Sequence, residues 1–256
     1  MRGKPPDIMR IKIINPNTTW SMTEKMARAA RAIAAPGTEI LAVSPEGGPA
    51  SIEGHYDEAV AVIGLLEEIR KGEAEGVDGY VIACFGDPGL MAAREAARGP
   101  VVGVAEAAMH YASLLAPGFS VVTTLGRTMG IAAHLAERYG MQRFCRRIRA
   151  AEIEVLALED EASGAYARIK GECERALAED ESGAIVLGCA GMTDLAARLQ
   201  QDLGVPVIDG VVAGVSLVES LVRLGLSPAK RGELAPPLAK TYTGRLAHLS
   251  PGAERL

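Results

Sequence analysis

Apolar and polar positions along the chain fall into two alternating kinds of segment. Short runs rich in β-branched residues are continuous enough to be strands buried on both faces. They predict strands at IKII (11–14), TEILAV (38–43), GYVIAC (79–84), VVGV (101–104), SVVTT (120–124), EIEVLA (152–157), AIVLGC (184–189) and VPVID (205–209). Stretches rich in Ala, Glu and Arg predict helices at 19–34, 56–75, 89–98, 105–115, 127–139, 163–179, 192–203 and 212–224. Strands that alternate with helices indicate an α/β fold with parallel sheets.

Three segments of the chain occur twice, in the same order. KIINPNTT (12–19) resembles SVVTTLGRT (120–128), GYVIACFGDPGL (79–90) resembles GAIVLGCAGMTDL (183–195), and GPVVGVAEAAMHYASLL (99–115) resembles VPVIDGVVAGVSLVESL (205–221). The offsets, taken from residue 14 to 122, 84 to 189 and 100 to 206, are 108, 105 and 106 residues. A nearly constant offset predicts two similar parallel-sheet halves, related by an internal pseudo-two-fold repeat, with an active-site cleft between them.

The repeat superimposes Cys84 on Cys189, and each cysteine ends a predicted strand before a glycine-containing turn. A single cysteine is usually a small buried core residue. Cys145 and Cys173, within charged predicted helices, keep that interpretation. The matched placement of Cys84 and Cys189 favours a functional pair instead.

Two thiols on opposite walls of a cleft suit the inversion of a carbon that bears a removable proton. One thiolate removes the proton from one face, and the other thiol returns a proton to the opposite face. Because a helix is predicted after each cysteine, we expect nearby helix amides to lower the pKa of both thiols. The amides of the two turns are also placed to hold an oxygen on which charge develops.

Composition excludes several other classes of protein. The 256 residues carry a net charge of −5 and are 48% hydrophobic, which is typical of a globular domain and unlike a protein that binds nucleic acid or a membrane surface. The N-terminus lacks a signal peptide, and no CxxC pair occurs, so we expect a cytoplasmic protein with reduced thiols. The four histidines lack metal-ligand spacing, so no metal site is expected. The basic run RFCRRIRA (143–150) is expected to form a solvated helix face or an interface.

Four motifs resemble those of the hydantoin racemases, a branch of the aspartate/glutamate racemase superfamily close to the allantoin racemases. They are INPNTT (14–19), SIEGHYDEA (51–59), ACFGDPGL (83–90) and LGCAGM (187–192). The resemblance implies cofactor-independent racemisation of 5-monosubstituted hydantoins by two-cysteine proton transfer, in a homo-oligomer that needs no metal. By this match Cys84 and Cys189 are the catalytic residues.

The same resemblance implies substrate-binding positions. It places Asn17 and Thr18 in the first substrate loop, and Thr123 and Thr124 in its repeat counterpart, although Asn17 equally suits a turn and the threonines suit helix caps. The other positions expected at the substrate are Ile52, Phe85, Gly86, Asp87, Ala190 and Gly191. Asp87 is also expected to cap the helix after Cys84, and it has no matching acid in the repeat, where Met192 is nearby.

The residues after the two cysteines distinguish this chain from the amino-acid racemases, which resemble one another in having Asn-Thr after the first cysteine and Thr after the second. Phe85-Gly86 and Ala190-Gly191 cannot bind an ammonium or carboxylate group by their side chains, which favours a neutral ring as substrate. An allantoin racemase, an amino-acid racemase, a cysteine-dependent decarboxylase or isomerase, and a non-catalytic small-molecule-binding protein stay open as alternatives.

Related folds carry their last helices back onto the first half. We therefore expect a discontinuous first half, residues 11–104 plus 217–256, and a second half of residues 105–216.

Overall fold

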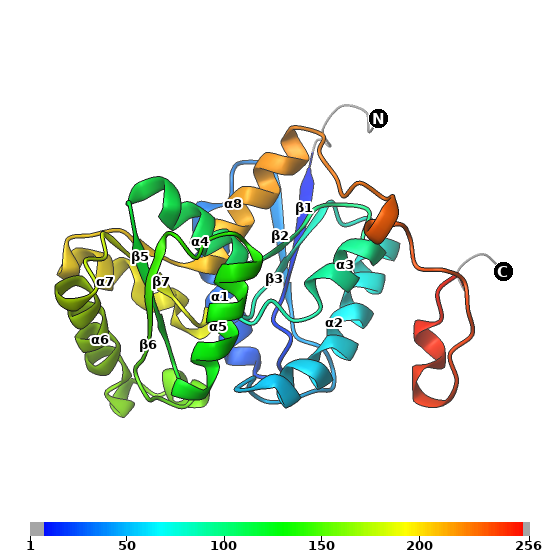
Figure 1. The fold of residues 1–256 in the computed structure, drawn as a ribbon. Coiled ribbons are helices and arrows are strands. Elements are labelled where there is room, and N and C mark those ends of the chain that lie inside the picture. Colours follow the sequence, from blue (N-terminus) through cyan, green and yellow to red (C-terminus); the bar gives the residue numbers. More distant parts are fainter. Residues whose placement is uncertain (1–7, 253–256) are drawn as a thin grey trace.

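The computed structural model describes residues 8–252, which form two four-stranded sheets flanked by helices (Figure 1). The first sheet, in the order β2-β1-β3-β4, contains β1 (Met9–Ile14), β2 (Thr38–Val43), β3 (Gly79–Ile82) and β4 (Val101–Gly103). The second sheet, in the order β6-β5-β7-β8, contains β5 (Phe119–Thr123), β6 (Cys145–Ala150), β7 (Ala184–Leu187) and β8 (Val207–Ile208). All strand pairs are parallel, so the predicted α/β fold of two similar halves is confirmed.

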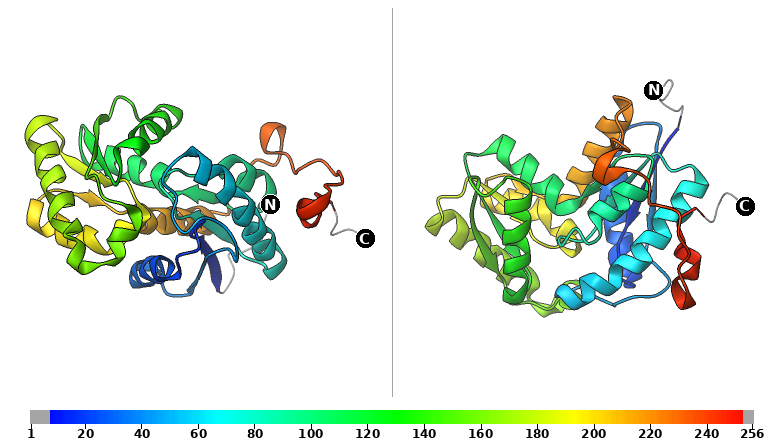
Figure 2. Two further views of the ribbon diagram at one scale, coloured as in Figure 1. Left: turned by 90° about the horizontal axis from the view of Figure 1, so that it is seen from below. Right: turned by 45° about the vertical axis from the view of Figure 1, so that its right-hand side comes forward.

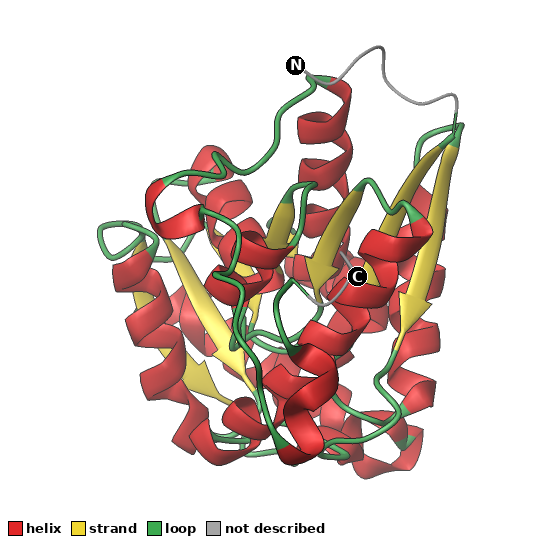
Figure 3. Cartoon of the chain, turned by 90° about the vertical axis from the view of Figure 1, so that its right-hand side faces the viewer, coloured by secondary structure: helices red, strands yellow, loops and turns green. Residues whose placement is uncertain are grey.

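Helices lie on both faces of the strands (Figure 3). They are α1 (Trp20–Ile33), α2 (His55–Glu75), α3 (Leu90–Ala96), α4 (Val104–Leu115), α5 (Met129–Arg138), α6 (Ala165–Glu179), α7 (Ala196–Leu203) and α8 (Gly210–Arg223). This double cover explains the continuous apolar runs at the centre of each sheet. Residues 80–82 and 184–187 are at most 2% exposed.

The two halves exchange one helix each. Helix α4 follows the last strand of the first sheet but packs against β7 and β8 of the second, whereas α8 follows the last strand of the second sheet and packs against β1, β3 and β4 of the first. The two helices also pack against each other. Helix α8 thus returns to the first sheet. The expected boundary at 216 and 217 lies inside α8, and the division into domains stays a prediction.

The strand predicted at 152–157 is wrong, and the strand in its place is β6 at Cys145–Ala150, within the basic run expected to be a helix face or an interface. β6 is an edge strand beside β5, so most of its arginines reach solvent, and a register shift at Phe119/Ser120 disturbs the alternation expected of a strand. Residues 152–157 instead leave the sheet at Glu152, where φ is 52°, and enter a 3₁₀ helix (Val155–Glu159). Ile153 and Val155 are buried there without being in a strand.

After α8 the chain runs along the outer side of the first half, shown in orange and red in Figure 2. Lys230 Nζ donates hydrogen bonds to the carbonyl oxygens of Arg94 and Glu95 at the end of α3 (2.6 and 2.9 Å). Farther along, the His248 ring contacts the Glu67 carboxylate on α2. Among the helices of residues 8–252, none is long and apolar enough to cross a membrane.

Candidate active site

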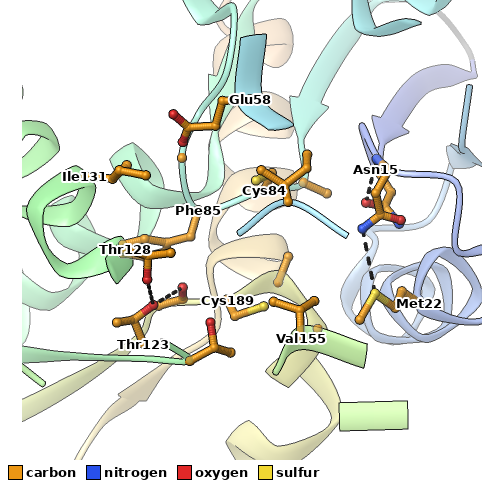
Figure 4. Close-up of a pocket in the computed structure, with 18 of the residues that line it drawn as sticks. Asn15, Met22, Glu58, Cys84, Phe85, Thr123, Thr128, Ile131, Val155 and Cys189 are labelled. Atoms are coloured by element: carbon orange, nitrogen blue, oxygen red, sulfur yellow. Dashed lines mark hydrogen bonds between the residues drawn. The ribbon is translucent and has the colours of Figure 1, made fainter. Parts of the chain in front are cut away.

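A cavity that is partly open to solvent lies between the carboxyl ends of the two sheets (Figure 4). Cys84 follows β3 of the first sheet, and Cys189 follows β7 of the second. Both line the cavity, as the repeat predicted. Eight of the positions expected at the substrate also line it, namely Asn17, Ile52, Phe85, Gly86, Thr123, Thr124, Ala190 and Gly191.

Burial raises the pKa of both thiols, which is opposite to the lowered pKa expected from the sequence. For Cys84 the raised pKa is opposed by a hydrogen bond from the Gly86 backbone and reinforced by the nearby thiol of Cys189 and by the charge of Glu58. Burial likewise raises the pKa of Cys189 to about 11, against a hydrogen bond from the Gly191 backbone.

The helix amides that were expected to lower the two pKa values are too far along the chain from the cysteines, because α3 begins at Leu90 and α7 at Ala196. The amide donors at the thiols come from the turns themselves.

Asn15 and Asn17 follow β1, and hydrogen bonds fix their side chains at the wall of the cavity. Asn15 Nδ2 donates to Asn17 Oδ1 (2.9 Å) and to Thr23 Oγ1 (3.0 Å), and Asn17 Oδ1 also accepts from the Thr19 backbone N–H (2.9 Å). Among residues 8–252, Asn17 Nδ2 donates only to the weak acceptor Met22 Sδ, at 3.7 Å. The Asn17 side chain is therefore fixed by these hydrogen bonds, and its Nδ2 can donate a hydrogen bond to a ligand oxygen.

Thr123, at the end of β5, lines the corresponding edge of the second sheet. Its hydroxyl donates to the Gly188 carbonyl oxygen (3.1 Å) and lies 3.0 Å from the hydroxyl of Thr128. Gly188 directly precedes Cys189, so the Thr123 hydroxyl helps to hold the backbone that leads into that cysteine.

Thr18 and Asp87, also expected at the substrate, do not line the cavity. The Thr18 hydroxyl donates to the Pro49 carbonyl oxygen at 3.3 Å. Asp87 is buried behind Cys84, where its carboxylate accepts hydrogen bonds from the backbone N–H groups of Ala105 and Glu106. It therefore caps α4, and not the helix after Cys84 as expected.

Sequence reasoning missed Glu58, which is the only charged side chain among the described residues that line the cavity. It belongs to the first turn of α2, within the motif SIEGHYDEA, and that motif is the signal that could have found it. Burial raises the pKa of its carboxyl group, and His55 Nδ1 lies 3.3 Å from Oε2. The remaining wall is neutral, with apolar side chains from Met22, Met26, Ile131 and Val155.

Known proteins are similar to this chain over most of its length. The family model described as Asp/Glu/Hydantoin racemase matches residues 11–218. A hydantoin racemase from Pseudomonas sp. (strain NS671) is 50% identical over 238 residues, which cover 93% of this chain and 96% of that protein. The solved structure of allantoin racemase from Klebsiella pneumoniae is 58% identical with a TM-score of 0.93, covering 95% of this chain and 99% of that one. Allantoin racemase from Pseudomonas fluorescens is 39% identical with a TM-score of 0.89, covering 92% and 100%. The chain therefore belongs to the Asp/Glu/Hydantoin racemase family, as its motifs implied, and is an isomerase of the racemase class.

Proposed function

We propose that this racemase inverts C5 of 5-monosubstituted hydantoins by proton transfer between Cys84 and Cys189. The observation that carries the proposal is the placement of two cysteines at equivalent strand ends of the two sheets, both lining one cavity. A hydantoin has the required acidic hydrogen, because C5 lies next to a ring carbonyl.

The two thiols exchange roles with the direction of reaction. In one direction the Cys84 thiolate removes the C5 proton, and the Cys189 thiol delivers its proton to the opposite face of the carbon. The enzyme then holds a neutral Cys84 and a Cys189 thiolate, which is the state needed for the reverse direction. The Gly86 and Gly191 backbone groups that hydrogen-bond the sulfurs stabilise the respective thiolates.

The carbonyl oxygen next to C5 gains negative charge when the proton leaves. The Asn17 Nδ2 donor, whose one partner among the described residues is a sulfur atom, is suited to that oxygen. Since its Oδ1 is already held by Asn15 and Thr19, the amide needs little reorganisation to donate.

The cavity favours a neutral ring over an amino acid. No lysine or arginine is among the described lining residues, so the carboxylate of an amino acid would find no cation there. Glu58 would in addition repel it. The apolar side chains of Met22, Met26, Ile131 and Val155 suit an uncharged substituent at C5.

Allantoin, which carries a ureido group at C5, is the second candidate. The 58% identity to an allantoin racemase favours it, and Glu58 supplies an acceptor for ureido N–H groups. A decarboxylase or a non-catalytic binding protein is less well supported, because neither needs a thiol on both sides of the cavity.

The test uses single enantiomers of benzyl-, isopropyl- and ureido-substituted hydantoins, with optical rotation followed over time and with L-glutamate and L-aspartate as controls. Cys84→Ser and Cys189→Ser are each expected to abolish racemisation, because a hydroxyl is a poor base. In deuterated water each variant is expected to exchange the C5 hydrogen of a different enantiomer, measured by NMR against the non-enzymatic rate. Exchange of the same enantiomer by both variants would contradict the two-thiol mechanism.

The expected homo-oligomer and the cytoplasmic location stay predictions. Light scattering during size-exclusion chromatography tests the first, and fractionation of the source cells tests the second.

A further inference from the structure

The turn that carries Cys84 is fastened to the N-terminus of α4 by Asp87. The Asp87 backbone N–H donates to the Cys84 carbonyl oxygen at 2.9 Å, which closes the turn. The Asp87 carboxylate accepts from the backbone N–H groups of Ala105 (3.1 Å) and Glu106 (3.0 Å), in the first turn of α4. Tyr139, at the end of α5 in the second half, donates its hydroxyl to the same carboxylate at 2.7 Å. Asp87 thus joins the Cys84 turn to α4 and to the opposite half.

The turn that carries Cys189 is also fastened to a helix N-terminus through an aspartate, but here the aspartate belongs to the helix. Thr193 lies in the 3₁₀ helix (Ala190–Leu195) that follows Cys189, and its hydroxyl donates to the buried carboxylate of Asp209. Asp209 is the N-cap of α8 and accepts from the backbone N–H of Val211 at 2.9 Å. In this half the acid belongs to the helix cap and the cysteine turn supplies only a hydroxyl.

The two halves carry the acid at different places. At the offset of 105 residues that superimposes the cysteines, Asp87 falls on Met192, the residue before Thr193, and the backbone N–H groups of Asp87 and Met192 donate to the carbonyl oxygens of the two cysteines. Asp209 is 106 residues after Gly103. Gly103 is the N-cap of α4 with φ −85° and ψ 147°, close to φ −84° and ψ 121° at Asp209. A Cβ atom on Gly103 would overlap the Asp87 carboxyl group, so the space filled by the Asp209 side chain in one half is filled by Asp87 in the other. No acid stands at the position that matches Asp87 in the repeat, as the sequence indicated, but the Asp209 carboxylate fills the corresponding space from the helix cap.

We propose that Asp87 and Asp209 are equivalent positioning residues, which hold the Cys84 and Cys189 turns at a fixed separation across the cavity. The proposal rests on the two-cysteine function proposed above. The N-termini of α4 and α8 adjoin each other, since a Cβ atom on Gly210 would lie 2.5 Å from the Val104 carbonyl oxygen. The two carboxylates therefore fasten both cysteine turns to the adjoining N-termini of α4 and α8. Proton removal and return at a single carbon require both sulfurs to be in place at once, so the rate of inversion depends on this attachment.

The exchanged layout allows a rescue experiment. Asp87→Thr removes the acid from the first half and is expected to lower kcat at least about tenfold with KM within about twofold, because the cavity lining is intact. Asp87→Thr combined with Gly103→Asp moves the acid of the first half from the cysteine turn to the helix cap, where the second half carries it, and kcat is expected to return to within about threefold of the wild-type value. A double variant with the wild-type melting temperature that is no more active than Asp87→Thr would overturn the proposal.

A second experiment reports on each thiol without requiring turnover. Tyr139→Phe and Thr193→Val each remove one hydroxyl donor from one of the two carboxylates. Alkylation of each cysteine by iodoacetamide in the full chain is then followed by peptide mass spectrometry. Tyr139→Phe is expected to change the rate at Cys84 at least about threefold and leave Cys189 unchanged, and Thr193→Val is expected to do the reverse.

The matched control is Tyr166→Phe, which removes a tyrosine–aspartate hydrogen bond (Tyr166 to Asp202, 2.9 Å) at an exposed site on α6. It is expected to change neither thiol. Equal changes at both thiols, or no change at either, in the Tyr139 and Thr193 variants would overturn the positioning role. Failure of the two-cysteine function appears separately, as racemisation that survives in Cys84→Ser or Cys189→Ser, and the alkylation rates still decide the positioning role.

Discussion

The Glu58 carboxylate lies against the Cα atom of Gly86, and a Cβ atom at position 86 would overlap it. Gly86 also hydrogen-bonds the thiol of Cys84 through its backbone, so the same glycine contacts the charge and the candidate base. This arrangement places one negative charge beside Cys84. It links the acidity of the Cys84 thiol, in the turn after β3, to a residue on α2.

Removal of that charge is expected to make Cys84 more acidic. Because the negative charge of Glu58 raises the pKa of Cys84, Glu58→Gln is expected to lower it and to move the onset of thiol alkylation to lower pH. Glu53 acts in the same way on Cys189, so Glu53→Gln is the matched variant and is expected to move only Cys189. The pH profile of iodoacetamide labelling, resolved by peptide, measures both. Identical profiles for Cys84 in the wild type and in Glu58→Gln would contradict this coupling.

The space at Gly86 gives a second prediction. In Gly86→Ala the added methyl group must displace the Glu58 carboxylate, and kcat/KM is expected to fall at least about tenfold, in line with overpacking costs of about 1–3 kcal/mol. Gly191→Ala is the matched change in the second turn. Its Cβ would meet Leu158 Cδ1 at 3.1 Å and Met22 Cε at 3.2 Å, so a small shift of these side chains relieves the contact, whereas the Glu58 carboxylate must move much farther. Its kcat/KM is expected to stay within about threefold of the wild-type value. Steady-state kinetics of both variants test the difference, and a similar loss in both would show that the Glu58 contact is unimportant.

The sequence predicted the parts of this site that repeat. Cys84 and Cys189 stand out because each follows an apolar run that is buried on both faces, and because the repeat superimposes one on the other. Glu58 has no such partner in the sequence, and its side chain reaches the cavity only because α2 places its first turn beside the Cys84 turn. The motif SIEGHYDEA marks the segment that contains it, but the packing of α2 is what brings its side chain to the cavity.

The relation between Asp87 and Asp209 could not be seen in the sequence for a different reason. Aligned residue by residue, Asp87 falls on a methionine and Asp209 falls on a glycine. The two carboxylates occupy equivalent places only in three dimensions, because the turn and the helix cap adjoin there. The β6 strand was missed because arginines occupy three of its six positions, two of them exposed and one buried in ion pairs, which removes the apolar pattern on which strand prediction depends.

One of those arginines is expected to be important for stability. Arg149 is 6% exposed and pairs with both oxygens of Asp180 (2.7 and 2.6 Å) and with Glu179 (2.8 Å). Arg149→Met leaves the buried Asp180 without its main partner and is expected to cost about 3 kcal/mol of unfolding free energy. Arg175→Met, which removes exposed pairs with Glu172 and Glu179, is the control and is expected to cost less than about 1 kcal/mol. Urea denaturation measures both, and equal losses would contradict the prediction.

Asp87 gives the last prediction, a dependence of stability on pH. Burial raises its pKa to about 7 in the folded protein, against the hydrogen bonds from Tyr139, Ala105 and Glu106, whereas the ordinary value for an aspartate is 3.8. Between these two values the folded protein retains a proton that the unfolded chain has lost. The Asp87 contribution to the free energy of unfolding therefore falls as the pH rises from about 4 to about 7, and is constant outside that window.

Asp87→Asn cannot titrate and is expected to remove this slope. The measured quantity is the difference in unfolding free energy between the wild type and Asp87→Asn, from urea denaturation at several pH values between 4 and 8. The wild type is expected to lose stability relative to the variant as the pH rises through the window. Asp202→Asn is the control, because its pairing with Lys170 and Tyr166 lowers the pKa of that exposed carboxyl group below its ordinary value. Its difference from the wild type is expected to be flat from pH 5 upward. If the Asp87→Asn difference is equally flat, the Asp87 carboxyl group is ionised throughout the window, and the donors of α4 and Tyr139 outweigh its burial.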